Sequence, residues 1–222
     1  MKPENAENPL IPAATVLVVG DAAEGLEVLM LRKNSGQVFG GMWVFPGGRV
    51  EEGDGSGDDA TRNAAVREAE EETGMALVPA DLVPFAHWVP PPEAPKRFDT
   101  WFFLVAVPAG AGEIVVDGGE IGDHVWTTPA TALARHAAGE IDLAPPTWVT
   151  LHRLAESTDV SSAVAAARAG DVEHFATRIG GIDDDLVAVW DPDAGYETGD
   201  LSLPGPRHRL VMATGGWKYE RT

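Results

Sequence analysis

The chain contains 222 residues, with 16 Lys and Arg, 35 Asp and Glu, a formal net charge of −19, and no cysteine. The missing cysteines exclude disulfides, thiolate nucleophiles and iron–sulfur clusters, and the acidic balance argues against a protein that coats nucleic acid. The six histidines are scattered with no pair at ligand spacing, which disfavours a zinc enzyme. With no apolar run of about 18 residues and no signal peptide, a cytoplasmic protein without a membrane partner is expected.

Apolar and β-branched runs predict the strands of the first part of the chain, at 14–19, 27–31, 82–89, 100–107, 113–116 and 124–127. Segments rich in Gly or acidic residues predict a loop at 34–42, a turn at 46–48 and an exposed loop at 51–59. Good helix formers predict a helix at 58–73 that Gly74 ends, and Pro129 opens a second helix at 129–138.

The character of the sequence changes after Gly139. Two prolines at 145–146 open a mostly helical stretch to about residue 169, and strands are expected at 186–190 and 209–212. Residues 10–140 are therefore predicted to form an α+β layered domain. Residues 141–222 are predicted to form a mainly helical C-terminal extension that packs on the same domain.

The most informative segment is the second half of the helix predicted at 58–73. At about 100° per residue, Glu68, Glu71 and Glu72 share an arc of about 100° on one helix face, whereas Glu70 points away. Carboxylates at this spacing repel one another close to a helix C-terminus, so neutralising Glu71 or Glu72 is expected to stabilise the metal-free protein. A hard divalent cation would turn the repulsion into binding, and a merely solvated acidic face is the alternative.

A Gly-rich turn upstream of this helix adds a second signal. Pro46-Gly47-Gly48 precedes Asp54 and then Arg67-Glu68-Ala69-Glu70-Glu71-Glu72-Thr73-Gly74-Met75. The pattern resembles the signature of the Nudix hydrolase family, which is Gly, five residues, Glu, seven residues, then Arg-Glu-aliphatic-x-Glu-Glu-x-Gly-aliphatic. The chain departs from it in having Asp54 in place of Glu and a longer spacer at 55–66.

The resemblance implies a Nudix fold, which is an α/β/α sandwich with a mixed β-sheet, and a site for Mg²⁺ or Mn²⁺. The implied metal ligands are Glu68, Glu71, Glu72 and the carbonyl of Gly47. Arg67 would pair with a carboxylate of the motif and hold it in place. Glu71, Glu72 and Arg67 are accordingly the first candidates for catalytic residues.

A further carboxylate is expected in the loop before the strand predicted at 124–127. Nudix proteins often carry a metal-binding or catalytic Glu there, ahead of a Trp strand and the helix that follows it. Glu120 precedes Trp126 by six positions and is our candidate for both roles. Asp117 and Asp123 are the alternatives.

The resemblance also implies the reaction, which is hydrolysis of a nucleoside diphosphate linked to a further group by a metal-activated water. The flanks of the motif, from Glu27-Val28-Leu29 through Arg97-Phe98-Asp99-Thr100 to Pro145-Pro146-Thr147, look like the acyl-coenzyme A diphosphatase branch. Arg32, Lys96 and Arg97 are scarce positive charges and candidates for binding the substrate phosphates. Ordinary exposed bases are the alternative.

Three functions stay open. The first is a Mg²⁺-dependent diphosphatase of coenzyme A or its thioesters, and the second is the same chemistry on ADP-ribose, NADH or another dinucleotide or nucleotide sugar. The third is a non-catalytic ligand sensor, which the complete carboxylate set disfavours because that cluster costs stability. The expected partner is a small-molecule nucleoside diphosphate, with no nucleic acid, and a homodimer is open because Nudix proteins often form one.

Overall fold

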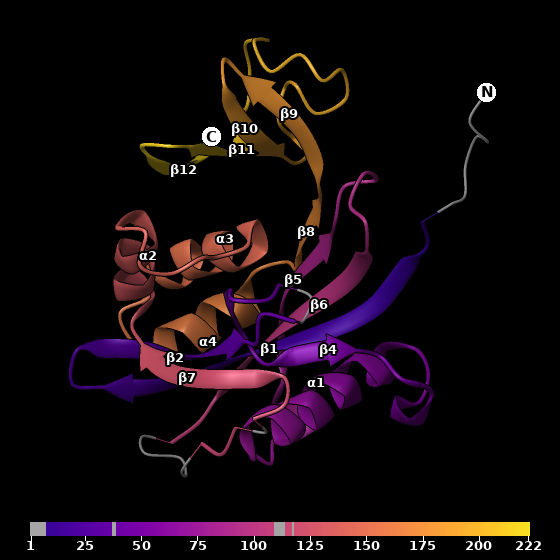
Figure 1. Cartoon of the computed structure of the whole chain (residues 1–222), viewed down its shortest axis with the longest axis vertical. Coiled ribbons are helices and arrows are strands. Elements are labelled where there is room, and N and C mark those ends of the chain that lie inside the picture. Colours follow the sequence, from indigo (N-terminus) through magenta and orange to yellow (C-terminus); the bar gives the residue numbers. More distant parts are fainter. Residues whose placement is uncertain (1–7, 37–38, 109–113, 117) are drawn as a thin grey trace.

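A mixed β-sheet built around the long first strand lies at the centre of the molecule (Figure 1). The computed structural model describes residues 8–36, 39–108, 114–116 and 118–222. In chain order the strands of this sheet are β1 (Leu10–Ala22), β2 (Gly25–Lys33), β3 (Trp43–Val44), β4 (Gly47–Arg49), β5 (Val83–Val89), β6 (Arg97–Ala106), β7 (Ile121–Thr127) and β8 (Glu173–Ala176). The order is β3-β2-β1-β6-β5-β8, with β4 beside β1 and β7 beside β2. β1 runs antiparallel to β2 and parallel to β6, so the sheet is mixed as predicted.

Helices cover both faces of this sheet (Figure 1). One face carries α1 (Asp58–Thr73), and the other carries α2 (Pro129–Ala137), α3 (Pro145–Leu154) and α4 (Val160–Ala169). Two short 3₁₀ helices, η1 (Glu52–Asp54) and η2 (Pro79–Asp81), flank α1 along the chain. The predicted α+β class and α/β/α layering are confirmed. Among the described helices, none is long and apolar enough to cross a membrane.

β1 is buried on both faces, which explains its uninterrupted apolar sequence. Val16 and Val18 pack toward α1, whereas Leu17 and Val19 pack on the opposite side, and none of the four is exposed. Because successive side chains of a strand point to opposite faces, this one strand contributes to both core layers. The strand predicted at 14–19 is therefore confirmed.

α1 lies close to the sheet because its inner face consists of alanines. Ala64, Ala65 and Ala69 are completely buried against β1 and β6. Gly74 ends the helix in the left-handed conformation, with a φ of 72°, and its N–H donates to the carbonyl of Glu70. The helix predicted at 58–73 and its stop are confirmed, and the acidic residues of its last turns are held near the sheet.

Three local predictions are wrong. The segment at 46–48 is not simply a turn, because Gly47–Arg49 pair with β1 as strand β4. The segment at 51–59 is not wholly exposed, because η1 turns Asp54 inward, where its carboxylate accepts hydrogen bonds from Arg67. Residues 114–116 form no strand, because Val115 donates its N–H to the carbonyl of Thr73 at the end of α1; Glu113 lies outside the described residues.

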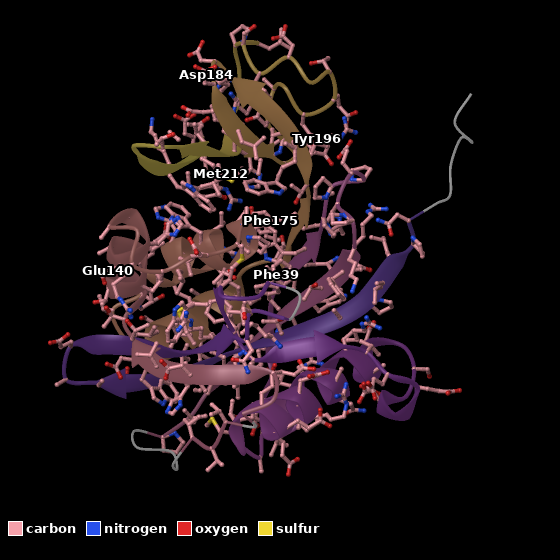
Figure 2. The ribbon with its side chains drawn as sticks, in the orientation of Figure 1. Phe39, Glu140, Phe175, Asp184, Tyr196 and Met212 are labelled. Carbon is pink, nitrogen blue, oxygen red and sulfur yellow. The ribbon has the colours of Figure 1, made fainter. Side chains whose placement is uncertain are left out.

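The C-terminal extension is mixed, so the prediction of a mainly helical extension is wrong. After α3 and α4, β8 joins the main sheet beside β5, and a second sheet follows with β9 (Arg178–Ile182), β10 (Asp185–Val189), β11 (His208–Ala213) and β12 (Gly216–Arg221). Figure 2 shows Phe175 where the two sheets meet, stacked 3.8 Å from Trp88 and edge-on to Trp190. The sequence did not predict β9, because this strand contains Gly180 and Gly181 and paired glycines are typical of turns. The boundary after residue 140 stays a prediction.

A buried ion pair joins the second sheet to the loop between β10 and β11. The carboxylate of Asp193 accepts a hydrogen bond from Nε of Arg209 at 2.7 Å and another from Nη2 at 2.6 Å. The Asp193 side chain is 0% exposed and the Arg209 side chain is 2% exposed. The backbone N–H groups of Gly195 and His208 donate to the same carboxylate. Burial alone would raise the pKa of Asp193, but these hydrogen bonds lower it to about 2.

Candidate active site

The carboxylate face of α1 meets the Gly47–Gly48 segment of β4. Glu72 is 4% exposed, and its Oε2 accepts the backbone N–H of Gly47 at 2.9 Å. The Glu68 carboxylate lies so close to Gly48 that any side chain there would displace it. A Cβ at Gly47 would collide with the backbone of Ala14 and Thr15, so this position also requires glycine. The two parts of the sequence motif are thus in direct contact.

Lys33 connects the helix to the loop that carries Glu120. Its Nζ lies 2.7 Å from Oε1 of Glu72 and 3.4 Å from Oε2 of Glu120. The Lys33 side chain is 12% exposed, so most of its length is covered. Burial alone would lower the pKa of Lys33, but the two carboxylates raise it, and the ammonium group stays charged.

Arg67 connects the helix to η1 and β4. Its guanidinium group forms two bonds to the carboxylate of Asp54, at 3.0 and 3.1 Å, and donates to the carbonyl of Arg49 at 2.9 Å. Nη1 lies 3.0 Å from Glu68 and 3.0 Å from Glu71. One planar cation therefore holds two motif carboxylates in register while a buried Asp fixes the cation itself.

The burial of these acids shifts their titration. Burial raises the pKa of Glu68 against the lowering effect of Arg67, and it raises the pKa of Glu72 against that of Lys33. By contrast, the hydrogen bonds from Arg67 lower the pKa of Asp54. The pKa shifts therefore separate the acids by environment, because burial dominates at Glu68 and Glu72 whereas the hydrogen bonds from Arg67 dominate at Asp54.

The residues that form this geometry lie in a region that matches a known family. The NUDIX domain family matches residues 9–156, which is more than half of the chain. The chain belongs to the NUDIX domain family. The stretch Arg67–Gly74, which we call the Nudix box because it resembles the family signature, lies within the matched residues where α1 meets β4.

Individual Nudix relatives agree with this assignment. A Caenorhabditis elegans protein with the provisional name nudix hydrolase 7 is 28% identical over 170 residues, which cover 60% of this chain and 57% of that relative. The chain thus spans little more than half the length of this curated relative. The crystal structure of a NUDIX hydrolase from Alicyclobacillus acidocaldarius has a TM-score of 0.67 and 26% identity, covering 75% of this chain and 100% of the other. The family match, this relative and this structure therefore agree on the family of the chain.

The Nudix fold also occurs in a ligand complex among the solved structures. The NUDIX domain of Shewanella oneidensis NrtR, complexed with ADP ribose, has a TM-score of 0.53 and 15% identity, covering 67% of this chain and 88% of the other. At this identity the likeness concerns the fold alone.

Nudix hydrolases generally use divalent metals such as Mg²⁺, and the donor set of this chain fits one. Glu68, Glu71 and Glu72 offer the hard oxygen ligands that Mg²⁺ and Mn²⁺ prefer, beside a glycine backbone that leaves room for close approach. Within the described part of the chain, however, no three acidic or histidine side chains gather closely enough to hold an ion. Lys33 and Arg67 neutralise the carboxylates instead, so a metal would replace part of these contacts.

The other predicted residues lie at different distances from this Nudix box. Glu70 is exposed on the outer side of α1, as predicted, and the Glu71 side chain is 59% exposed. Arg32 is exposed one position before Lys33 and therefore points to the opposite face of β2.

The other two predicted bases lie far along the sheet from the carboxylates. Arg97 pairs with Leu10 of β1, whereas Gly47 pairs with Thr15. These two positions of β1 are five residues apart, which corresponds to about 17 Å. Lys96 is exposed beside Arg97, so the structure does not bring either base to the carboxylates.

Sequence reasoning missed Lys33 and undervalued Asp54. Strand alternation could have found Lys33, because Leu29 and Leu31 face α1 and every second residue of a strand shares a face. Asp54 carried no such signal, since the lengthened spacer obscures its alignment and only the folded chain brings it to Arg67. The aromatic side chains of Trp88 and Phe102, on β5 and β6, are 3% and 5% exposed and belong to the core.

Proposed function

We propose that this protein is a Mg²⁺- or Mn²⁺-dependent diphosphatase that cleaves a nucleoside diphosphate linked to a further group, with coenzyme A or an acyl-coenzyme A as the substrate. The observation that carries the proposal is the convergence of Glu68 and Glu72 on the Gly47–Gly48 segment. These residues would hold a divalent cation, which when bound would supply charge neutralisation for a diphosphate and activation of the attacking water.

The residues of the site divide into those that bind the cation and those that position the ligands. Glu68, Glu71 and Glu72 are the proposed ligands, with the carbonyl of Gly47. Arg67 and Asp54 are positioning residues, because Arg67 holds the carboxylates of Glu68 and Glu71 and Asp54 holds Arg67.

The general base has two candidates. The side chains of Glu71 and Glu120 are 59% and 56% exposed, whereas those of Glu68 and Glu72 are largely covered. A base that takes a proton from water needs this access. Glu120 is also the proposed additional metal ligand, and its contact with Lys33 keeps it beside Glu72.

The choice of substrate rests on the resemblance of the flanking sequence and on the placement of positive charge. Coenzyme A carries a 3′-phosphate that ADP-ribose and NADH lack. Arg97 donates to the carbonyls of Asn8 and Pro90, and among the described residues it has no ion pair, so its charge is available to a phosphate. Its distance from the Gly47 segment suits a long substrate.

A substrate panel tests the proposal. Coenzyme A, an acyl-coenzyme A, ADP-ribose, NADH and nucleoside triphosphates are incubated with Mg²⁺ or Mn²⁺, and the products are identified by mass. Adenosine 3′,5′-bisphosphate and 4′-phosphopantetheine, or its acyl form, are expected, with no turnover in EDTA and poor turnover with Zn²⁺. Full turnover in EDTA would disprove the metal mechanism.

An arginine variant separates the substrate from the chemistry. Arg97→Ala is expected to weaken coenzyme A more than dephospho-coenzyme A, by about 1–3 kcal/mol if a charged hydrogen bond is lost. A higher kcat/KM for ADP-ribose or NADH would replace coenzyme A as the substrate and leave the metal site unchanged. Binding of any of these ligands without turnover would favour the sensor. The cytoplasmic location and the homodimer stay predictions of the sequence.

A further inference from the structure

Two histidines that are 87 positions apart in sequence meet at the edge of the main sheet. β5 and β8 run parallel, and their register places His87 directly beside His174. Residues paired across neighbouring strands point to the same face, so both imidazoles extend from one side of the sheet. Their Nδ1 atoms are 2.9 Å apart.

His87 is held in place from two further sides. Its Nε2 lies 2.5 Å from Oδ1 of Asp99 on β6, and its ring stacks on Trp101 with centroids 4.6 Å apart. A carboxylate can only accept, so in the neutral ring Nε2 carries the proton and Nδ1 presents a lone pair. A carboxylate that fixes the tautomer in this way is the usual support of a metal-binding histidine.

His174 is hydrogen-bonded to His87. Because Nδ1 of His87 presents a lone pair, Nδ1 of His174 donates across the 2.9 Å contact, and a bound metal ion would take the place of that proton. The residue is exposed on the edge strand, so an ion reaches it directly from solvent. The two rings thus converge with one lone pair already aimed at the gap between them.

We propose that His87 and His174 bind a late first-row transition-metal ion, Ni²⁺ or Cu²⁺, at a site separate from the carboxylates of α1. Two nitrogens bonded at about 2.0–2.1 Å and at a right angle lie about 2.9 Å apart, whereas a tetrahedral angle separates them by about 3.3 Å. The hydrogen bond already holds the two Nδ1 atoms 2.9 Å apart, so a tetragonal or octahedral ion would need little movement of the rings. Nitrogen ligands also select against Mg²⁺, which prefers oxygen.

Water would complete the coordination. Within the described residues no third acidic or histidine side chain is placed to make a three-ligand set. Asp99 is a positioning residue, because its carboxylate contacts His87 on the nitrogen that faces away from the ion. The site is therefore built from two ligands and one orienting group on three adjacent strands.

Trp101 provides a reporter for the experiment. The full chain is titrated with Ni²⁺, and separately with Cu²⁺, in excess Mg²⁺ that occupies oxygen sites, while tryptophan fluorescence and binding heat are recorded. We expect one equivalent to bind and to quench the indole stacked on His87. His174→Ala should weaken binding at least tenfold, and Asp99→Asn by about 10- to 100-fold, the range for residues that orient a ligand. Trp101→Phe should remove most of the quench and keep the heat.

His136 supplies a matched control. Its ring also lies 4.6 Å from a tryptophan, Trp217, but its Nδ1 is bonded to the carbonyl of Ile141 and it has no imidazole beside it among the described residues. His136→Ala should therefore keep the wild-type affinity. Equal affinity of the wild type and His174→Ala, or an equal loss in His136→Ala, would overturn the proposal. Circular dichroism and melting confirm that each variant is folded, and exposed His174 tolerates truncation.

Discussion

Nζ of Lys33 lies 2.7 Å from Oε1 of Glu72, an ion pair whose side chains are 12% and 5% exposed. The same ammonium group reaches Glu120 at 3.4 Å, so one residue of β2 joins the end of α1 to the loop before β7. Removing one partner of a buried pair leaves the other charge without compensation. In the metal-free protein Lys33 therefore stabilises carboxylates that a cation would otherwise balance.

Lys33→Met tests two effects of Lys33, namely that it stabilises the buried carboxylate of Glu72 and that it competes with a metal ion. We expect the free energy of unfolding in EDTA to fall by about 3 kcal/mol, because Glu72 stays buried without its cation. The affinity for Mn²⁺ should rise, since the metal no longer competes with an ammonium group. Urea unfolding and calorimetric titration measure the two effects, and exposed Lys96→Met is the control. Unchanged Mn²⁺ affinity would show that Lys33 does not occupy the place of the metal charge.

Glu72→Gln and Glu70→Gln compare opposite faces of α1. The first should reduce the turnover rate by orders of magnitude because it removes a metal ligand, and the second should change it little, since Glu70 is exposed. Helix repulsion alone predicted that Glu72→Gln would raise the melting temperature without metal. The structure reverses that expectation, because the change leaves Lys33 buried and unpaired. Equal kinetic effects at the two positions would contradict the assignment of faces.

Arg67→Lys and Asp54→Asn test the link that holds the box. A Lys ammonium group cannot form the two parallel bonds of Arg67 to Asp54, so each single change should destabilise the protein by about 1–3 kcal/mol. The double variant should lose less than the sum, and turnover should fall with Arg67→Lys because Glu68 and Glu71 lose their common partner. Arg178→Lys, in an exposed ion pair with Glu197, is the control. Additive losses in urea unfolding would refute the coupling.

Asp193 should account for part of the decrease in the free energy of unfolding at acidic pH. Its pKa is about 2 in the folded protein against 3.8 for an unperturbed Asp, so the unfolded state binds the proton first as the pH falls. The stabilisation is complete above about pH 4 and disappears as the pH falls through about 2, a change of about 2 kcal/mol. Unfolding free energies from pH 5 to 2 should show this slope in the wild type and in Asp184→Asn, but not in Asp193→Asn. The same slope in Asp193→Asn would exclude Asp193 as its source.

The parts of the fold that short-range patterns control were predictable. α1 follows from a run of helix formers and from Gly74, whose N–H closes the last turn on Glu70. β1 follows from its apolar run, and the box follows from acids that share one helix face. These features depend on residues within a few positions of one another, which interact in the same way whatever the rest of the chain does.

The sequence by itself determined the class of the fold, the acidic helix and its link to a glycine segment. Only the tertiary structure decided that Lys33 rather than Arg32 reaches the carboxylates, that Asp54 anchors Arg67, and that His87 meets His174. The second sheet was also decided only by the tertiary structure, because its strand β9 contains two glycines and is stabilised by pairing with β10. The physical reason is register. A contact between distant segments depends on which residues of two strands are paired, and a shift by one position would turn every side chain to the other face.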